Sequence, residues 1–158
     1  MAAPSATSRS TPSGIPLRDG HSTLITLAAD ADISFWEKTV QPPGIDGGDP
    51  VNATTMHNTT YRVQRPSSLI SLTEVTSTVA YDPAVYTQIL AVVNVETTIT
   101  ITFADGSTVA FFGYLQKFEA QEVEEGEQPE AEITIVPTNW DSSNSVEAGP
   151  AVASVGSV

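Results

Sequence analysis

One segment limits the possible fold of this chain more than any other: TTITITFADGSTVAFFGYLQKFEAQEVEEGEQPEAEITIVPT, residues 97–138. Polar and apolar residues alternate along much of it, and a period of two is typical of β-strands with one buried face. The Asp105-Gly106 pair favours a type I′ hairpin turn, in which both residues take positive φ. We therefore expect antiparallel strands at 95–104, 107–121 and 130–138.

The alternation also assigns side chains to the two faces of this sheet. Thr98, Thr100 and Thr102 form a polar, uncharged face. One apolar face is expected to comprise Val95, Ile99, Ile101, Phe103, Ile133 and Ile135. In the middle strand, large side chains occur in both phases, which predicts burial on both sides. One phase holds Phe112, Tyr114 and Phe118, and the other holds Phe111, Leu115 and Lys117.

Strands are also expected before this segment. Residues 22–28 and 33–41 show strand patterns, and Asp30-Ala31-Asp32 between them is typical of a turn. Residues 70–80 alternate in the same way, with one shift of phase.

One short helix is expected at about 82–93. Asp82 is a suitable N-cap, and Pro83 suits the first helical position. Apolar residues then recur at helical spacing, and Tyr86 and Leu90 are expected to widen the apolar face that lies on the sheet. The recurring positions are Val85, Ile89, Val92 and Val93.

The predicted fold is therefore mainly β: a sandwich or barrel with one short flanking helix, a long loop and flexible termini. Residues 1–20 and 141–158 are rich in small and polar residues without periodicity, and they predict a flexible N-terminal arm and a flexible C-terminal tail. The β-domain between them covers residues 21–140.

The long loop is expected at about 41–68, where prolines and glycines are frequent and periodicity is weak. Connections of this length are uncommon in compact domains and are usually binding loops or mobile segments. Met56, Tyr61, Arg62 and Arg65 belong to residue types that are enriched at protein interfaces. Two interpretations stay open: a solvated surface loop, or a loop that contacts a neighbouring subunit.

The net charge of −13 lies almost entirely in the second half of the chain. Residues 1–70 carry five basic and six acidic side chains, whereas residues 71–158 carry thirteen acidic side chains and only Lys117. Because affinity for nucleic acid comes largely from Lys and Arg, a conventional DNA-binding protein is not expected. The acidic residues gather at one predicted hairpin tip: Glu119, Glu122, Glu124, Glu125, Glu127, Glu130 and Glu132.

A calcium site at this tip is conceivable, but the run lacks the Asp/Asn-Gly pattern of a calcium loop. A solvated, acidic rim is the simpler interpretation. The chain contains no cysteine, and its two histidines, His21 and His57, stand in loop-like sequence. No motif of a nucleophile elbow, phosphate-binding loop or zinc site occurs. We expect no enzymatic activity, no metal and no cofactor.

No membrane association is expected either. The longest apolar run is ILAVV at 89–93, far shorter than a membrane-spanning helix. The first residues, MAAPSATSRS, lack the apolar region of a secretory signal.

The order of segments resembles the major tail tube proteins of long-tailed bacteriophages. The similarity covers roughly residues 15–140. It rests on the sequence TTMHNTTYRVQRP in the long loop, YDP at 81–83 before the helix, the Asp-Gly hairpin followed by FFGYLQKFE, and the closing PEAEITIVPT.

The resemblance implies a structural virion protein that forms hexameric rings, which stack into the tail tube through which DNA is ejected. Implied partners are further copies of the chain, a tape measure protein, a terminator protein and a distal tail protein, with DNA passing through without specific binding. Implied locations are the phage tail and, during assembly, the host cytoplasm. Thr98, Thr100 and Thr102 would then line a channel, and the 41–68 loop would contact the next ring.

Two alternatives remain open from the sequence. The first is a β-sandwich decoration or adhesion module on a capsid or tail surface, which predicts a stable monomer or trimer. The second is a tail-terminator or baseplate protein that forms one ring without further stacking.

Overall fold

A computed structural model describes residues 22–153 of the chain, apart from residues 31 and 34. The predicted N-terminal arm at 1–20 lies outside the described residues, and so do residues 154–158 at the end of the predicted tail.

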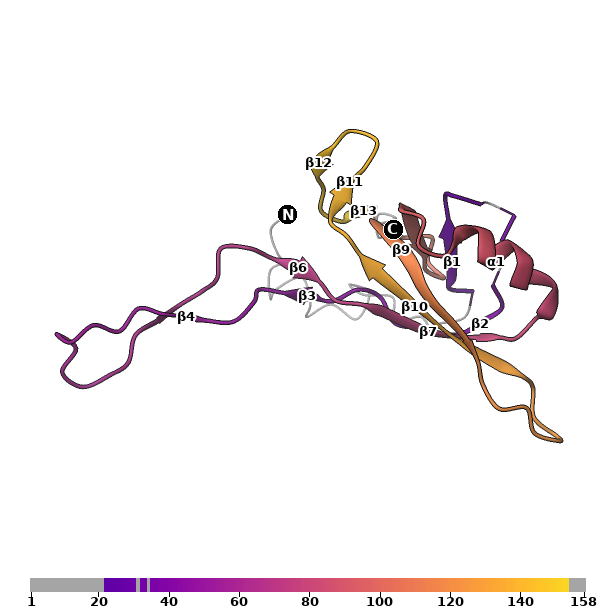
Figure 1. The fold of residues 1–158 in the computed structure, drawn as a ribbon, viewed down its shortest axis with the longest axis horizontal. Helices are drawn as coiled ribbons and strands as arrows, with labels where there is room; N and C mark the ends of the chain where they lie inside the picture. The colour runs from indigo at the N-terminus through magenta and orange to yellow at the C-terminus, as the bar shows by residue number, and fades with distance from the viewer. Residues whose placement is uncertain (1–21, 31, 34, 154–158) are drawn as a thin grey trace, which may run out of the picture.

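Most of the described chain forms one antiparallel seven-stranded sheet (Figure 1). Its strands follow the order β1-β8-β9-β10-β7-β2, and β13 pairs with the first part of β9. Their bounds are β1 Leu24–Leu27, β2 Glu37–Val40, β7 Val75–Ala80, β8 Thr97–Thr102, β9 Thr108–Ala120, β10 Glu130–Pro137 and β13 Ala151–Ala153. The prediction of a mainly β fold is confirmed.

The sheet curls around a single hydrophobic core. Ile99, Ile101, Ile133 and Ile135 are fully buried, as the alternation predicted. Further core residues come from the neighbouring strands and from the helix: Ile25, Leu27, Val75, Val79, Ile89, Val92, Phe111 and Leu115. Val95 was expected in this face but is 42% exposed, because it precedes the first paired residue of β8.

The curl brings the two edge strands close together. Strands β1 and β2 end the sheet on opposite sides, yet the Ile25 backbone N–H donates a 2.8 Å hydrogen bond to Glu37 Oε1. A side-chain carboxylate therefore joins edges that have no backbone ladder between them. The two predicted strands before residue 42 exist, but each pairs with a distant strand: β1 with β8, and β2 with β7.

The Asp105-Gly106 hairpin is present, but its turn is not of type I′. Gly106 has φ +86°, whereas Asp105 is not among the described residues with positive φ. The Gly106 N–H donates to the Phe103 carbonyl (2.9 Å), and the Phe103 N–H donates to the Ser107 carbonyl (2.9 Å). This geometry is that of a turn closed by a glycine bulge, which also suits an Asp-Gly sequence.

A second bulge changes the faces of β9. Thr134 pairs with Lys117 and Ile135 pairs with Leu115, so Gln116 is an extra residue on β9. The bulge shifts the alternation by one residue. Phe118 therefore packs against the core, with its ring centroid 6.1 Å from that of Tyr81, and is not in phase with Phe112 and Tyr114. The prediction that both faces of β9 are buried is also wrong, since Gln116 and Lys117 are exposed.

The predicted helix is present as a 3₁₀ turn, Pro83–Val85, followed by α1, Tyr86–Val92. Asp82 caps it through a 2.9 Å hydrogen bond from the Ala84 N–H. Only Ile89 and Val92 of α1 are buried. Tyr86 and Leu90 are 50% and 63% exposed, so the buried face of the helix is narrower than predicted. A helix of two turns contacts the sheet along only one row of side chains. Within the described residues, no helix combines the length and hydropathy needed to cross a bilayer.

The region predicted as a flexible tail contains regular structure up to residue 153. Strands β11, Trp140–Asp141, and β12, Val146–Glu147, form a small hairpin, and β13 then joins the main sheet. Hydrogen bonds from the Asn144 amide to Asp141 Oδ2 (2.6 Å) and from the Ser143 N–H to Asp141 Oδ1 (2.9 Å) hold the turn. Polar turns of this kind carry no hydrophobic period, which is why the pattern missed them.

Asp141 makes the stability of this hairpin sensitive to acid. The Asn144 amide lowers the pKa of Asp141 below its ordinary value of 3.8 by stabilising the carboxylate. A lowered pKa means that the stabilisation is present above pH 3.8 and is lost as pH falls through the folded-state pKa. We expect Asp141→Asn to unfold at lower urea concentration at neutral pH, with the difference from the native chain shrinking in acid. A difference that is constant with pH would contradict this role.

Ser77 on β7 is the one buried side chain, among those described, whose polar atom has no hydrogen-bond partner. An unsatisfied buried hydroxyl is costly, by about 1–3 kcal/mol. We expect Ser77→Ala to raise the free energy of unfolding by about 1 kcal/mol, measured by urea denaturation. A clear loss of stability would show that the hydroxyl is satisfied in solution.

Candidate assembly interface

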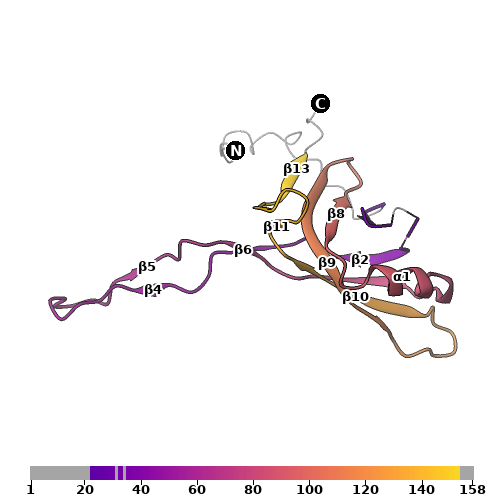
Figure 2. The same cartoon turned by 45° about the horizontal axis from the view of Figure 1, so that its top comes forward.

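The long connection between β2 and β7, residues 41–74, is a narrow two-stranded ribbon rather than an irregular loop (Figures 1 and 2). Two short ladders lie along it: β3, Ile45–Asp46, with β6, Ser71–Leu72, and β4, Val51–Asn52, with β5, Gln64–Arg65. Backbone pairing and polar side chains hold the ribbon together. For example, the Val63 N–H donates to Thr54 Oγ1 (2.9 Å).

The ribbon projects far from the sheet and buries almost nothing. None of its side chains from 47 to 70 is buried. The four residues predicted at an interface all lie on its outer part: Met56, Tyr61, Arg62 and Arg65. Met56 is fully exposed and Tyr61 is 80% exposed. Large apolar side chains held away from the core are typical of surfaces that bind another molecule.

The acidic hairpin, residues 119–132, joins β9 to β10 and lies at the opposite end of the molecule from the ribbon (Figures 1 and 2). Of the seven glutamates predicted at this tip, Glu130 and Glu132 are half-buried and five are exposed: Glu119, Glu122, Glu124, Glu125 and Glu127. Val123 in the same hairpin is 67% exposed. No group of three His, Cys, Asp or Glu side chains among the described residues has metal-binding geometry.

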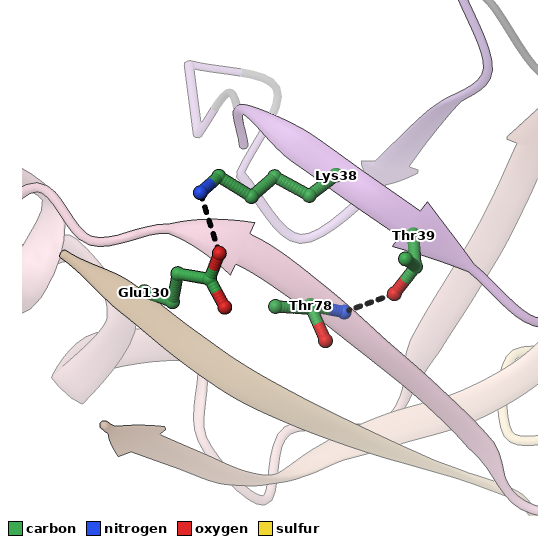
Figure 3. Close-up of polar contacts among 4 residues, drawn as sticks. All are labelled: Lys38, Thr39, Thr78 and Glu130. Atoms are coloured by element: carbon green, nitrogen blue, oxygen red, sulfur yellow. Dashed lines mark hydrogen bonds and ion pairs between the residues drawn. The ribbon is translucent and has the colours of Figure 1, made fainter. Parts of the chain in front are cut away.

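Two of the glutamates in the acidic hairpin are paired with lysines. Lys38 Nζ lies 2.5 Å from Glu130 Oε1, and this contact joins β2 to β10 across β7 (Figure 3). Lys117 contacts Glu119, and the hydrogen bond and charge of that carboxylate raise the pKa of Lys117. Beside the first pair, Thr39 Oγ1 accepts a 3.2 Å hydrogen bond from the Thr78 N–H (Figure 3).

Thr98, Thr100 and Thr102 share one face of β8, opposite the buried isoleucines. Paired strands continue this face, because residues directly opposite in a ladder point to the same side. Thr100 pairs with Thr26, Thr102 with Thr108, and Thr76 with Thr134. Thr98 pairs with Phe112, and Thr134 pairs with Lys117, so this face combines hydroxyl groups with an aromatic ring and a charged side chain.

The interior position of β8 and β9 limits how neighbouring chains could join this sheet. β8 is paired on both sides, by β1 and β9, and β9 is paired by β8, β10 and β13. The free edges of this sheet belong to β1 and β2, each four residues long, and to the three-residue β13, which pairs only with β9. Short edge strands discourage unspecific pairing. An open pocket of about 370 Å³ beside these edges is lined by residues such as Glu37, Lys38 and Phe103.

Several further apolar residues outside the outer ribbon are exposed. Trp36 is 69% exposed just before β2, and Leu69 and Ile70 at the base of the ribbon are 78% and 70% exposed. Leu69 and Trp140 line an open pocket of about 590 Å³ between the ribbon and the β11–β12 hairpin.

The fold itself is shared with proteins of two large particles. One chain from a structure described as the anti-feeding prophage baseplate, 6-fold symmetrised, matches 73% of this chain and 87% of its own length, with a TM-score of 0.54 and 6% identity. Another, from the virion of a native gene transfer agent particle, matches 87% of this chain and 99% of its own length, with a TM-score of 0.56 and 7% identity. No protein-family profile and no curated protein sequence matches the chain.

Proposed function

We propose that this chain is a structural protein of a phage or phage-derived particle, and that it assembles into hexameric rings that stack into a tail tube. The observation that carries the proposal is the fold shared with chains of a 6-fold symmetrised baseplate and of a virion, over most of the length of each. The role is mechanical, and it requires neither catalysis nor a cofactor.

The surface of the chain supports such a role. The ribbon places Met56, Tyr61 and two arginines beyond the body of the domain, where only another molecule can cover them. A head-to-tail contact between identical chains produces a ring if the rotation closes and a filament if it does not. Both geometries are compatible with a tube of stacked rings.

The threonine face suits the wall of a channel for DNA. Hydroxyl groups tolerate water, and the face lacks the dense Lys and Arg that bind phosphates by counterion release. The chain's net charge of −13 adds general repulsion from DNA. DNA would therefore move through such a channel without specific binding.

Sedimentation velocity of the purified chain over a wide concentration range tests this proposal. Ring and tube assembly predicts a hexamer or larger polymer that grows with concentration. A decoration or adhesion module predicts a monomer or trimer at all concentrations. A terminal or baseplate ring predicts a discrete hexamer that does not grow further.

A further inference from the structure

The positive charges of the described chain divide into two groups. Lys38 and Lys117 are paired with Glu130 and Glu119 within the same molecule. Arg62 and Arg65 form no ion pair with any described residue, and both are exposed on the ribbon. The outer ribbon, residues 51–65, contains these two arginines, His57 and no carboxylate. It is a small cationic surface on a strongly acidic chain.

The acidic hairpin has the complementary composition. Residues 119–132 contain seven glutamates and no basic residue. Glu122, Glu124, Glu125 and Glu127 form no ion pair with any described residue. The exposed Val123 lies among them, as Met56 and Tyr61 lie beside the arginines of the ribbon. Both surfaces thus combine charge with an apolar contact.

These two surfaces lie at opposite ends of the molecule and cannot meet within one chain (Figures 1 and 2). A second copy can join them, because the ribbon of one copy can reach the hairpin of the next. The same contact then repeats along a series of copies. Complementary charge also sets the orientation of such a contact and disfavours the reverse one.

We propose that Arg62 and Arg65 on the ribbon of one copy bind the acidic hairpin of the next copy, centred on Glu124 and Glu125. This proposal rests on the proposed function. It names the partner of the ribbon, a second copy of the chain, and the surface that the ribbon binds, the acidic hairpin. The attraction acts between exposed charges, so assembly is expected to weaken as ionic strength rises.

Charge reversal in two separate variants tests the contact. One variant carries Arg62→Glu and Arg65→Glu, and the other carries Glu124→Lys and Glu125→Lys. Each alone is expected to associate at least about tenfold more weakly than the native chain at low salt. Mixed together, they are expected to form alternating assemblies, because each ribbon then meets a hairpin of opposite charge. A chain with all four changes is expected to assemble by itself.

A matched control separates the local contact from the effect of net charge. Arg62→Gln with Arg65→Gln changes the net charge by −2, as does Thr87→Glu with Gln88→Glu on the exposed side of α1. Only the first pair of changes is expected to weaken association. Equal effects of the two pairs would overturn the proposal, since general repulsion would then explain the loss.

The mixing experiment also keeps this proposal distinct from the proposed function. If the native chain forms rings or tubes but the two charge-reversal variants do not associate when mixed, the ribbon–hairpin contact is overturned and the structural role stays intact. Association in the mixture without native rings or tubes would support the contact and contradict the tube. Failure of the mixture to associate at low salt would overturn the contact in either case.

Discussion

Replacing residues 47–70 with Asn-Gly is expected to abolish assembly of the chain while leaving its sheet domain folded. The replacement is geometrically simple, because Asp46 and Ser71 are directly paired in the β3–β6 ladder and a two-residue Asn-Gly turn can join them. It removes Met56, Tyr61, Arg62 and Arg65 together. If the ribbon forms the contact between copies, the truncated chain has lost that contact entirely.

The truncation should have little effect on folding. None of the removed residues is buried, and the entropy of loop closure changes by only about 0.6 kcal/mol for each halving of loop length. We therefore expect a cooperative thermal transition close to that of the native chain, combined with a monomer in sedimentation. Rings or tubes of normal size from the truncated chain would reject the ribbon as an assembly element.

Gly113→Ala is expected to have the opposite effect, because it destabilises the fold itself. A Cβ atom at Gly113 would lie 2.6 Å from the Val136 carbonyl oxygen and 3.2 Å from Pro137 Cα. Both are backbone atoms of β10, which cannot rotate away as a side chain could. Gly113 also pairs with Thr97 and Pro137 at the point where β8, β9 and β10 meet.

We expect Gly113→Ala to lower the free energy of unfolding by about 3 kcal/mol, at the upper end of the usual cost of overpacking. The measurement is urea denaturation followed by tryptophan fluorescence. Gly149→Ala is the matched control, because no atom lies within 4 Å of its added Cβ and its φ is not positive. Equal stability of the two variants would show that β9 and β10 can separate without cost.

Hydrophobic periodicity was sufficient to predict the long strands and the helix. Ile99, Ile101, Ile133 and Ile135 alternate with polar residues, and Asp82 before Pro83 is a strong local start signal. These features depend on residues close in sequence. The bulge at Gln116 depends on the register between β9 and β10, so Phe118 was assigned to the wrong face.

The ribbon and the β11–β12 hairpin were missed for a different reason. Their strands are two residues long and are held by polar contacts, such as those of Thr54 and Asp141, so they leave no apolar period. The contact surface at Met56, Tyr61, Arg62 and Arg65 was predicted from residue types that are enriched at interfaces, and it stays a prediction. Their position at the far end of the molecule from the acidic hairpin is a property of the fold and has no local signal.

Negative-stain electron microscopy of the purified, concentrated chain tests the proposed tube most directly. A tail tube protein predicts rings of uniform diameter, with six-fold symmetry in end-on views, and tubes of the same diameter in side views. Isolated monomers or trimers at every concentration would contradict it.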